Sequence, residues 1–234
     1  MHNTSDRLLQ WLYTDIRHRI DYHDTITVLV GTAEKPFTVH REALCAKSRF
    51  FAAACSSRWT EGKEKVVRLS EQKAESFQEY VHWVYNHEID LEPLPEQMSA
   101  SPNTTELDKG RRRVRCQYLE LYLLADKLRD TKLANRVMDL LVDVCCVRGL
   151  LLPSVVLITR AYEQTAPGSR LRSLLVDLWV ACRRSGNLEG SVTGLPRDFV
   201  NDLVMKLLPA TPRTPKAAIE RGKRKYQEIE VDAA

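Results

Sequence analysis

The stretch from Phe37 to Ala54 constrains the fold of this chain most, because its hydrophobic period changes in the middle. Phe37 and Val39 alternate with polar residues, which is the period of a half-buried strand. From Glu42 onward, apolar residues recur at three- and four-residue spacing, as on short helices. Ser48 falls between two helical pieces, and its hydroxyl can cap the second one. We therefore predict a strand that runs directly into a small helical hairpin.

Two further strands are predicted around this stretch. Apolar β-branched residues occupy every second position of residues 26–30, which predicts a strand that ends at Gly31. The turn of residues 31–35 then leads into the strand at Phe37, so we expect an antiparallel hairpin. Residues 65–69 predict a third, shorter strand.

The rest of the chain has mostly helical periodicity. Apolar residues at helical spacing predict helices within residues 8–20, 77–85, 121–128, 133–144, 155–162, 171–179 and 199–208. Prolines and polar residues interrupt this pattern over residues 86–117, where we expect a long surface loop. After Pro209, prolines and a charge-rich end predict a disordered tail.

The composition argues for an ordinary globular protein. Of its 234 residues, 44% are hydrophobic and 28% charged, and the net charge of +4 implies neither a nucleic-acid nor a membrane partner. The most apolar region, residues 140–158, is broken by charges, Gly149 and Pro153, so we expect no membrane span. None of the six cysteines forms a Cys-x-x-Cys pattern. We expect free thiols and an intracellular location, in the cytoplasm or the nucleus.

Several stretches resemble the BTB (also called POZ) domain family. Residues 37–51 carry the pattern Phe-x-Val-His-Arg-x-x-Leu-x-x-x-Ser-x-Phe-Phe of this family. Residues 83–85 are similar to the end of its third helix, residues 121–128 resemble its Leu-Tyr-x-Leu-Ala-Asp-Lys-Tyr helix, and residues 133–137 follow as its fifth helix does. Residues 161–177 resemble the helical extension that is common in fungal BTB proteins.

The resemblance implies an α+β fold, namely a small, mostly antiparallel sheet capped by helices and followed by an all-helical extension. On this basis the chain divides into four parts. They are an N-terminal helix (1–22), the BTB domain with its loop (23–146), the helical extension (147–209) and a basic and acidic tail (210–234).

The resemblance also implies a non-enzymatic function in which the chain binds other proteins. Many BTB domains homodimerise, and many dock to a cullin scaffold of a ubiquitin ligase. Trp59 and Glu61 match a hydrophobic-x-Glu element of cullin-binding members, although Trp59 packed over the sheet edge and a solvated Glu61 explain the pattern as well. The family Asp that lines a charged pocket at the dimer interface aligns with Thr25, beside Asp24. This departure weakens the expectation of a homodimer, and a homodimerising scaffold without ubiquitin chemistry stays an alternative function.

No residues in the sequence point to catalysis, a cofactor or a metal. Glycine-rich phosphate loops, nucleophile elbows and metal-ligand spacings do not occur, and we expect His40 to be a structural histidine at the strand end. Basic runs at residues 109–115 and 221–225 suggest an alternative function, a nuclear BTB factor that binds nucleic acid or an import receptor. Neither run contains an aromatic residue for base stacking, so we expect a solvated charged loop at residues 109–115.

Overall fold

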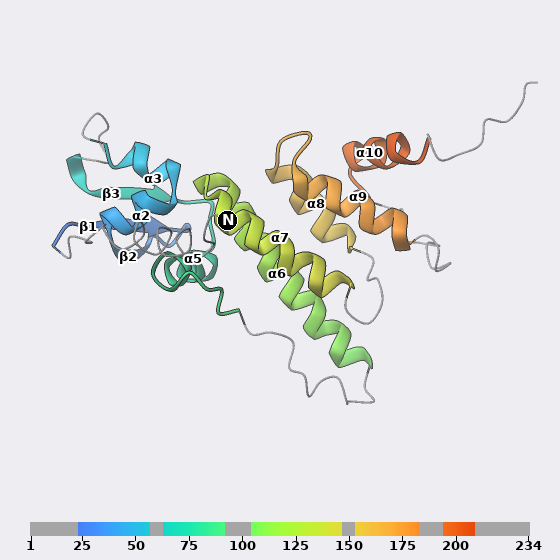
Figure 1. Ribbon diagram of the computed structural model, residues 1–234, viewed down its shortest axis with the longest axis horizontal. Helices are drawn as coiled ribbons and strands as arrows, with labels where there is room; N and C mark the ends of the chain where they lie inside the picture. The colour runs from blue at the N-terminus through green and yellow to red at the C-terminus, as the bar shows by residue number, and fades with distance from the viewer. Residues whose placement is uncertain (1–22, 57–62, 92–103, 147–152, 183–193, 209–234) are drawn as a thin grey trace, which may run out of the picture. The chain divides into compact units, whose positions relative to one another are not determined.

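The computed structural model describes residues 23–56, 63–91, 104–146, 153–182 and 194–208, which form two compact units (Figure 1). The first unit contains β1 (Thr25–Val30), β2 (Lys35–His40), α2 (Arg41–Lys47), α3 (Arg49–Ala54), β3 (Val66–Leu69), α5 (Ala74–Asn86), α6 (Thr104–Leu128) and α7 (Thr131–Cys146). The second contains residues 153–162, most of which belong to α8 (Val155–Gln164), together with α9 (Arg170–Cys182) and α10 (Arg197–Leu207).

The three described strands form one sheet in the order β2-β1-β3. The predicted hairpin is confirmed, because β1 and β2 pair antiparallel from Thr25 with His40 to Val30 with Lys35. β3 instead pairs parallel to β1 on the side away from β2, and α2 and α3 connect β2 to β3. The α+β class is confirmed, and the described sheet combines one antiparallel with one parallel pair.

The strand-to-helix switch predicted in residues 37–54 is confirmed, with β2 followed directly by α2 and α3. Ser48 lies between the two helices in an extended conformation that turns the chain. Its hydroxyl accepts a hydrogen bond from the backbone N–H of Phe51 at 3.0 Å, as predicted for a cap. The same hydroxyl donates to the carbonyl of Leu128 at 2.6 Å, so the cap also fastens α6 to the helical hairpin.

An aromatic cluster fills the space between the hairpin helices and α5. Phe51, Phe77 and Tyr80 are each fully buried, with ring centroids 5.9 to 6.5 Å apart. Burial of three large side chains at one place supplies a large apolar area, which is the main stabilising contribution to such a core. The predicted helical face of Phe77 and Tyr80 is therefore the face that α5 turns toward the core.

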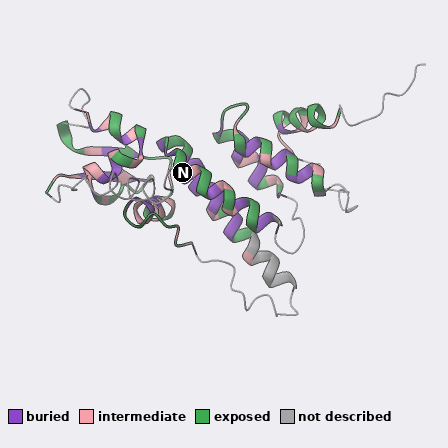
Figure 2. Ribbon diagram, viewed as in Figure 1, coloured by how far each residue is buried: buried purple, intermediate pink, exposed green. Residues whose placement is uncertain are grey.

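Helix α6 corrects the prediction of a loop over residues 86–117. The helix begins at Thr104, so residues 104–117 of the predicted loop are helical. Arg, Lys and Glu are good helix formers, and the polar composition that suggested a loop is compatible with a helix. Val114, Tyr118 and Leu121 are buried at three- and four-residue spacing, and α6 packs along α7. Figure 2 shows buried residues recurring between exposed ones along this pair.

The second unit has its own core of three aromatic side chains. Phe199 of α10 is fully buried and contacts Tyr162 of α8 and Trp179 of α9, with ring centroids 5.5 and 5.4 Å apart. Pro196 precedes α10 as its N-cap, and the helix covers most of the range 199–208 that the sequence predicts. The predicted N-terminal helix and the predicted tail lie outside the described residues.

Candidate protein-interaction site

A cluster of three charged side chains lies at the start of the sheet, and we call it the charged cluster. Asp24, just before β1, accepts hydrogen bonds from Arg41 at the start of α2 and from Lys65, just before β3, the latter at 3.0 Å. The backbone N–H of Arg41 also donates to the carbonyl of Asp24 at 2.9 Å. Three segments far apart in the sequence are thereby joined at one end of the sheet.

Both cations act on the ionisation of Asp24. The hydrogen bond from Lys65, followed by that from Arg41, lowers the pKa of the Asp24 carboxyl below its ordinary value. The hydrogen bond to Asp24 correspondingly raises the pKa of Arg41. The Asp24 side chain is 18% exposed, whereas Arg41 and Lys65 are 41% and 58% exposed. The cluster therefore offers a shielded carboxylate that lies beneath two accessible cations.

Two contacts tie the end of α5 to α2, beside the charged cluster. The ring Nδ1 of His40 lies 2.7 Å from the hydroxyl of Tyr85, which also accepts from the backbone N–H of His40 at 3.1 Å. Lys47 at the other end of α2 bonds the ring of His87 at 2.9 Å. The prediction of a structural role for His40 at the strand end is confirmed.

Trp59 and Glu61, the residues predicted to contact a cullin, lie outside the described residues. The chain on either side of them is anchored in the core. Cys55, which follows α3, is 6% exposed, and Val67 in β3 is 2% exposed.

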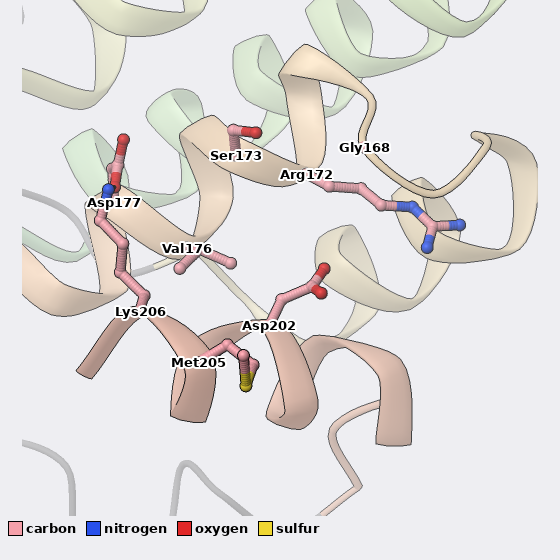
Figure 3. Close-up of a pocket in the computed structure, with 8 residues that line it drawn as sticks. All are labelled: Gly168, Arg172, Ser173, Val176, Asp177, Asp202, Met205 and Lys206. Atoms are coloured by element: carbon pink, nitrogen blue, oxygen red, sulfur yellow. The ribbon is translucent and has the colours of Figure 1, made fainter. Parts of the chain in front are cut away.

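A cleft of about 350 Å³ lies between α9 and α10 in the second unit (Figure 3). The charged side chains that line it bond within the unit. Lys206 pairs with Asp177 at 2.9 Å, and Asp202 accepts from the hydroxyl of Tyr162 at 2.7 Å. Arg172 donates to the carbonyl of Tyr162 at 2.8 Å and lies 4.3 Å above its ring. Burial, followed by the bond to Asp202, raises the pKa of Tyr162. We interpret this cleft as a structural polar network.

Helix α10 also carries an exposed apolar face, which the sequence did not reveal. Val204, Met205 and Leu208 are 46%, 69% and 60% exposed, and they lie within one turn of one another. Leu208 belongs to the apolar pattern that predicts the last helix within residues 199–208. Leu208 follows the last residue of α10 as its C-cap, with helical backbone angles, and its side chain is exposed.

The basic run of residues 109–115 is part of α6, and the expectation of a solvated loop there is wrong. Arg112 and Arg113 are exposed, but Arg115 is only 5% exposed. The second basic run, residues 221–225, lies outside the described residues. The described part of the first run therefore presents fewer charges to a partner than its sequence suggests.

Two features of the described residues bear on other classes of function. His, Cys, Asp and Glu side chains in these ranges do not gather in groups of three that could hold a metal ion. Among the helices of this part of the chain, none combines the length and apolar character needed to cross a bilayer.

Comparison with known families decides the assignment of the first unit. The sequence model of the BTB/POZ domain matches residues 13–104, a range that includes the sheet, the helical hairpin and α5. The chain contains a BTB/POZ domain. BTB domains are protein-protein interaction modules and are typically non-enzymatic.

Solved BTB domains resemble the chain distantly. The BTB domain of zebrafish PATZ1 is 14% identical, with 61% of this chain and 98% of that one covered and a TM-score of 0.34. The BTB domain of human Gigaxonin is 13% identical, with 60% and 94% covered and a TM-score of 0.33. No curated protein matches the sequence. The closeness to fungal BTB proteins with a helical extension stays a prediction.

Proposed function

We propose that the chain is an adaptor that docks a cullin scaffold of a ubiquitin ligase through its BTB domain. The observation that supports this proposal is the match of residues 13–104 to the BTB/POZ domain model, a range that contains Trp59 and Glu61. A large aromatic side chain beside a carboxylate has the usual composition of an interface hot spot.

A quantitative pull-down from a lysate of the native cell tests this proposal. The full chain is compared with a Trp59→Ala, Glu61→Lys double variant whose fold is checked by circular dichroism. A matched control carries Val156→Ala and Asp139→Lys, because Val156 is 76% exposed and Asp139 is exposed on α7. The control also removes one apolar side chain and reverses one carboxylate.

The expected result is a cullin recovered with the wild type and the control and lost with the folded double variant. Absence of a cullin from every eluate overturns the adaptor role. Equal recovery with all three forms keeps the adaptor role and removes Trp59 and Glu61 as its site.

A second candidate function, a homodimerising scaffold, is favoured by the charged cluster. Asp24 lies next to Thr25, the position of the family Asp, and it holds the ion pairs with Arg41 and Lys65. Asp24 therefore supplies a carboxylate beside position 25, where the family has Asp. This carboxylate supports a homodimer even though Thr25 departs from the family pattern.

Sedimentation equilibrium tests the homodimer. We expect twice the chain mass for the wild type and a dimer weakened by about tenfold in an Arg41→Ala, Lys65→Ala variant, since unpairing a charge at an interface is costly. A wild-type monomer at all concentrations overturns this candidate.

The nuclear alternative stays a prediction of the sequence alone. Deletion of residues 211–234 tests it, and an unchanged nuclear signal together with unchanged salt-sensitive DNA retention removes it.

A further inference from the structure

Two cysteines of the helical hairpin meet at one backbone carbonyl. The Sγ of Cys45 on α2 donates to the carbonyl oxygen of Phe51 at 3.6 Å. The backbone N–H of Cys55, which follows α3, donates to the same oxygen at 2.8 Å. Both cysteines are free, and each thiol shifts the pKa of the other. The turn at Ser48 thus brings together two thiols that are ten positions apart.

The two thiols have unequal surroundings. Cys45 is partly exposed and follows Arg41 by four positions, which places both side chains on one face of α2. Cys55 is only 6% exposed. The hydrogen bond from Cys55, aided by the charge of Arg41, lowers the pKa of Cys45. The bond to Cys45, followed by burial, raises the pKa of Cys55. Cys45 therefore ionises first, while Cys55 keeps its proton.

We propose that Cys45 and Cys55 are a redox pair that closes to a disulfide when a hydroperoxide oxidises Cys45. An accessible thiolate beside a second, resolving thiol is the arrangement that redox-sensing cysteines use. The pair lies in the helical hairpin, where Cys45 shares α2 with Arg41 of the charged cluster, and its chemistry does not depend on cullin docking.

The chemistry proceeds in two steps. The Cys45 thiolate attacks the hydroperoxide, an S–O bond forms, the O–O bond breaks and an alcohol (or water, from hydrogen peroxide) leaves after protonation. The Cys55 sulfur then attacks the sulfenic sulfur of Cys45, the S–S bond forms, the S–O bond breaks and the Cys55 proton leaves with the hydroxyl as water. The two thiols supply the two electrons that reduce the peroxide.

The sequence makes this proposal easy to test by peptide mapping. Lys47 and Arg49 lie between the two cysteines, so trypsin places Cys45 in peptide 42–47 and Cys55 in peptide 50–58. The reduced full chain is treated with hydrogen peroxide, alkylated and digested without reductant. We expect one linked peptide, lighter by two hydrogens than the two free peptides together, to replace both of them.

Three variants isolate the roles of the two thiols. Cys55→Ala is expected to leave Cys45 as a sulfenic acid that dimedone labels, because its resolving partner is gone. Cys45→Ser is expected to leave Cys55 unoxidised at the same dose, because Cys55 is buried. Cys116→Ser removes an exposed cysteine of α6, and it is expected to leave the linked peptide unchanged.

Two outcomes overturn the proposal. One is recovery of both peptides with free thiols after the oxidant has modified the exposed Cys116. The other is Cys45 linked to a cysteine other than Cys55. Both outcomes are read from the wild-type chain, so the test stands even where the Cys55→Ala variant does not fold.

Discussion

The two units use the same kind of bond in different surroundings. In the BTB unit, the indole N–H of Trp83 donates to Asp130 at 3.0 Å, and Asp130 is 2% exposed. In the second unit, the hydroxyl of Tyr162 donates to Asp202 at 2.7 Å, and Asp202 is exposed on α10. The first bond is shielded from water and joins α5 to the start of α7, whereas the second lies at the rim of a cleft.

The difference shows how each unit is held together. The other oxygen of Asp130 caps α7 by accepting from the backbone N–H of Leu133 at 3.0 Å, and Ser48 bonds Leu128 across eighty positions of the chain. Buried polar bonds of this kind are costly to break and hold distant segments in one arrangement. The second unit contains one such bond, from Arg172 to the carbonyl of Tyr162, and its core consists of the aromatic contacts around Phe199. A rigid BTB core and a separately stabilised helical unit follow from this difference.

The largest expected effect concerns the core of the second unit. Phe199→Ala removes a fully buried ring and leaves a cavity. We therefore expect the free energy of unfolding of the second unit to fall by about 3–5 kcal/mol. Amide hydrogen exchange should accelerate in α9 and α10 and stay unchanged in β1 and α5. Equal acceleration in both units would contradict their separate stabilisation.

Asp130→Ala probes the buried bonds of the BTB unit. The change leaves the indole N–H of Trp83 and the backbone N–H of Leu133 without their acceptor. We therefore expect the free energy of unfolding to fall by about 3 kcal/mol. Urea unfolding followed by Trp fluorescence measures it. Asp130→Asn keeps one acceptor oxygen and should lose less. Equal losses in the two variants would show that the acceptor bonds do not dominate.

Two serines allow a matched test of the same comparison. Ser48→Ala should cost about 1–2 kcal/mol, because it removes a short buried bond to Leu128 and a helix cap. Ser169→Ala removes only the longer bond from the N–H of Arg172, at 3.4 Å, and should cost about 0.5 kcal/mol. Thermal unfolding of both variants checks the order. A larger loss of stability for Ser169→Ala than for Ser48→Ala would contradict the difference between the two units.

The smallest expected effect concerns the exposed side of the BTB unit. Asp24→Asn should cost less than about 1 kcal/mol, because its partners are largely solvated. The folded state lowers the pKa of Asp24, so its contribution is present above the unfolded-state value and disappears as the pH falls through the folded-state value, below 3.8. Wild type and variant should therefore unfold alike in acid. A difference that persists at the lowest pH contradicts the ion-pair explanation.

Local features of the fold could be predicted from the sequence. The period change at Glu42 located the strand and the helical hairpin, and the cap at Ser48 followed from the residue type and its position. The parallel pairing of β3 was not predicted, because period reveals a strand but not its direction. The start of α6 at Thr104 was missed, because its polar first turns have the composition of a loop.

Long-range contacts could not be predicted from the sequence, for a different reason. The bonds of Ser48 to Leu128 and of Trp83 to Asp130 join residues whose separation carries no periodic signal. The choice of Asp24 over Thr25 as the site of the ion pairs depends on the positions of Arg41 and Lys65 in space. Trp59 and Glu61 remain predictions of the resemblance, because they lie outside the described residues.

A binding titration tests the central claim most directly. The purified full chain is titrated by calorimetry with the purified cullin of the same cell, and the Trp59→Ala, Glu61→Lys variant and the Val156→Ala, Asp139→Lys control are titrated alongside. We predict saturable binding by the wild type and the control, and a loss of about 2 kcal/mol, or roughly thirtyfold in affinity, in the double variant. Absence of binding by the wild type would contradict the adaptor function, and equal affinity of all three forms would contradict the assigned site.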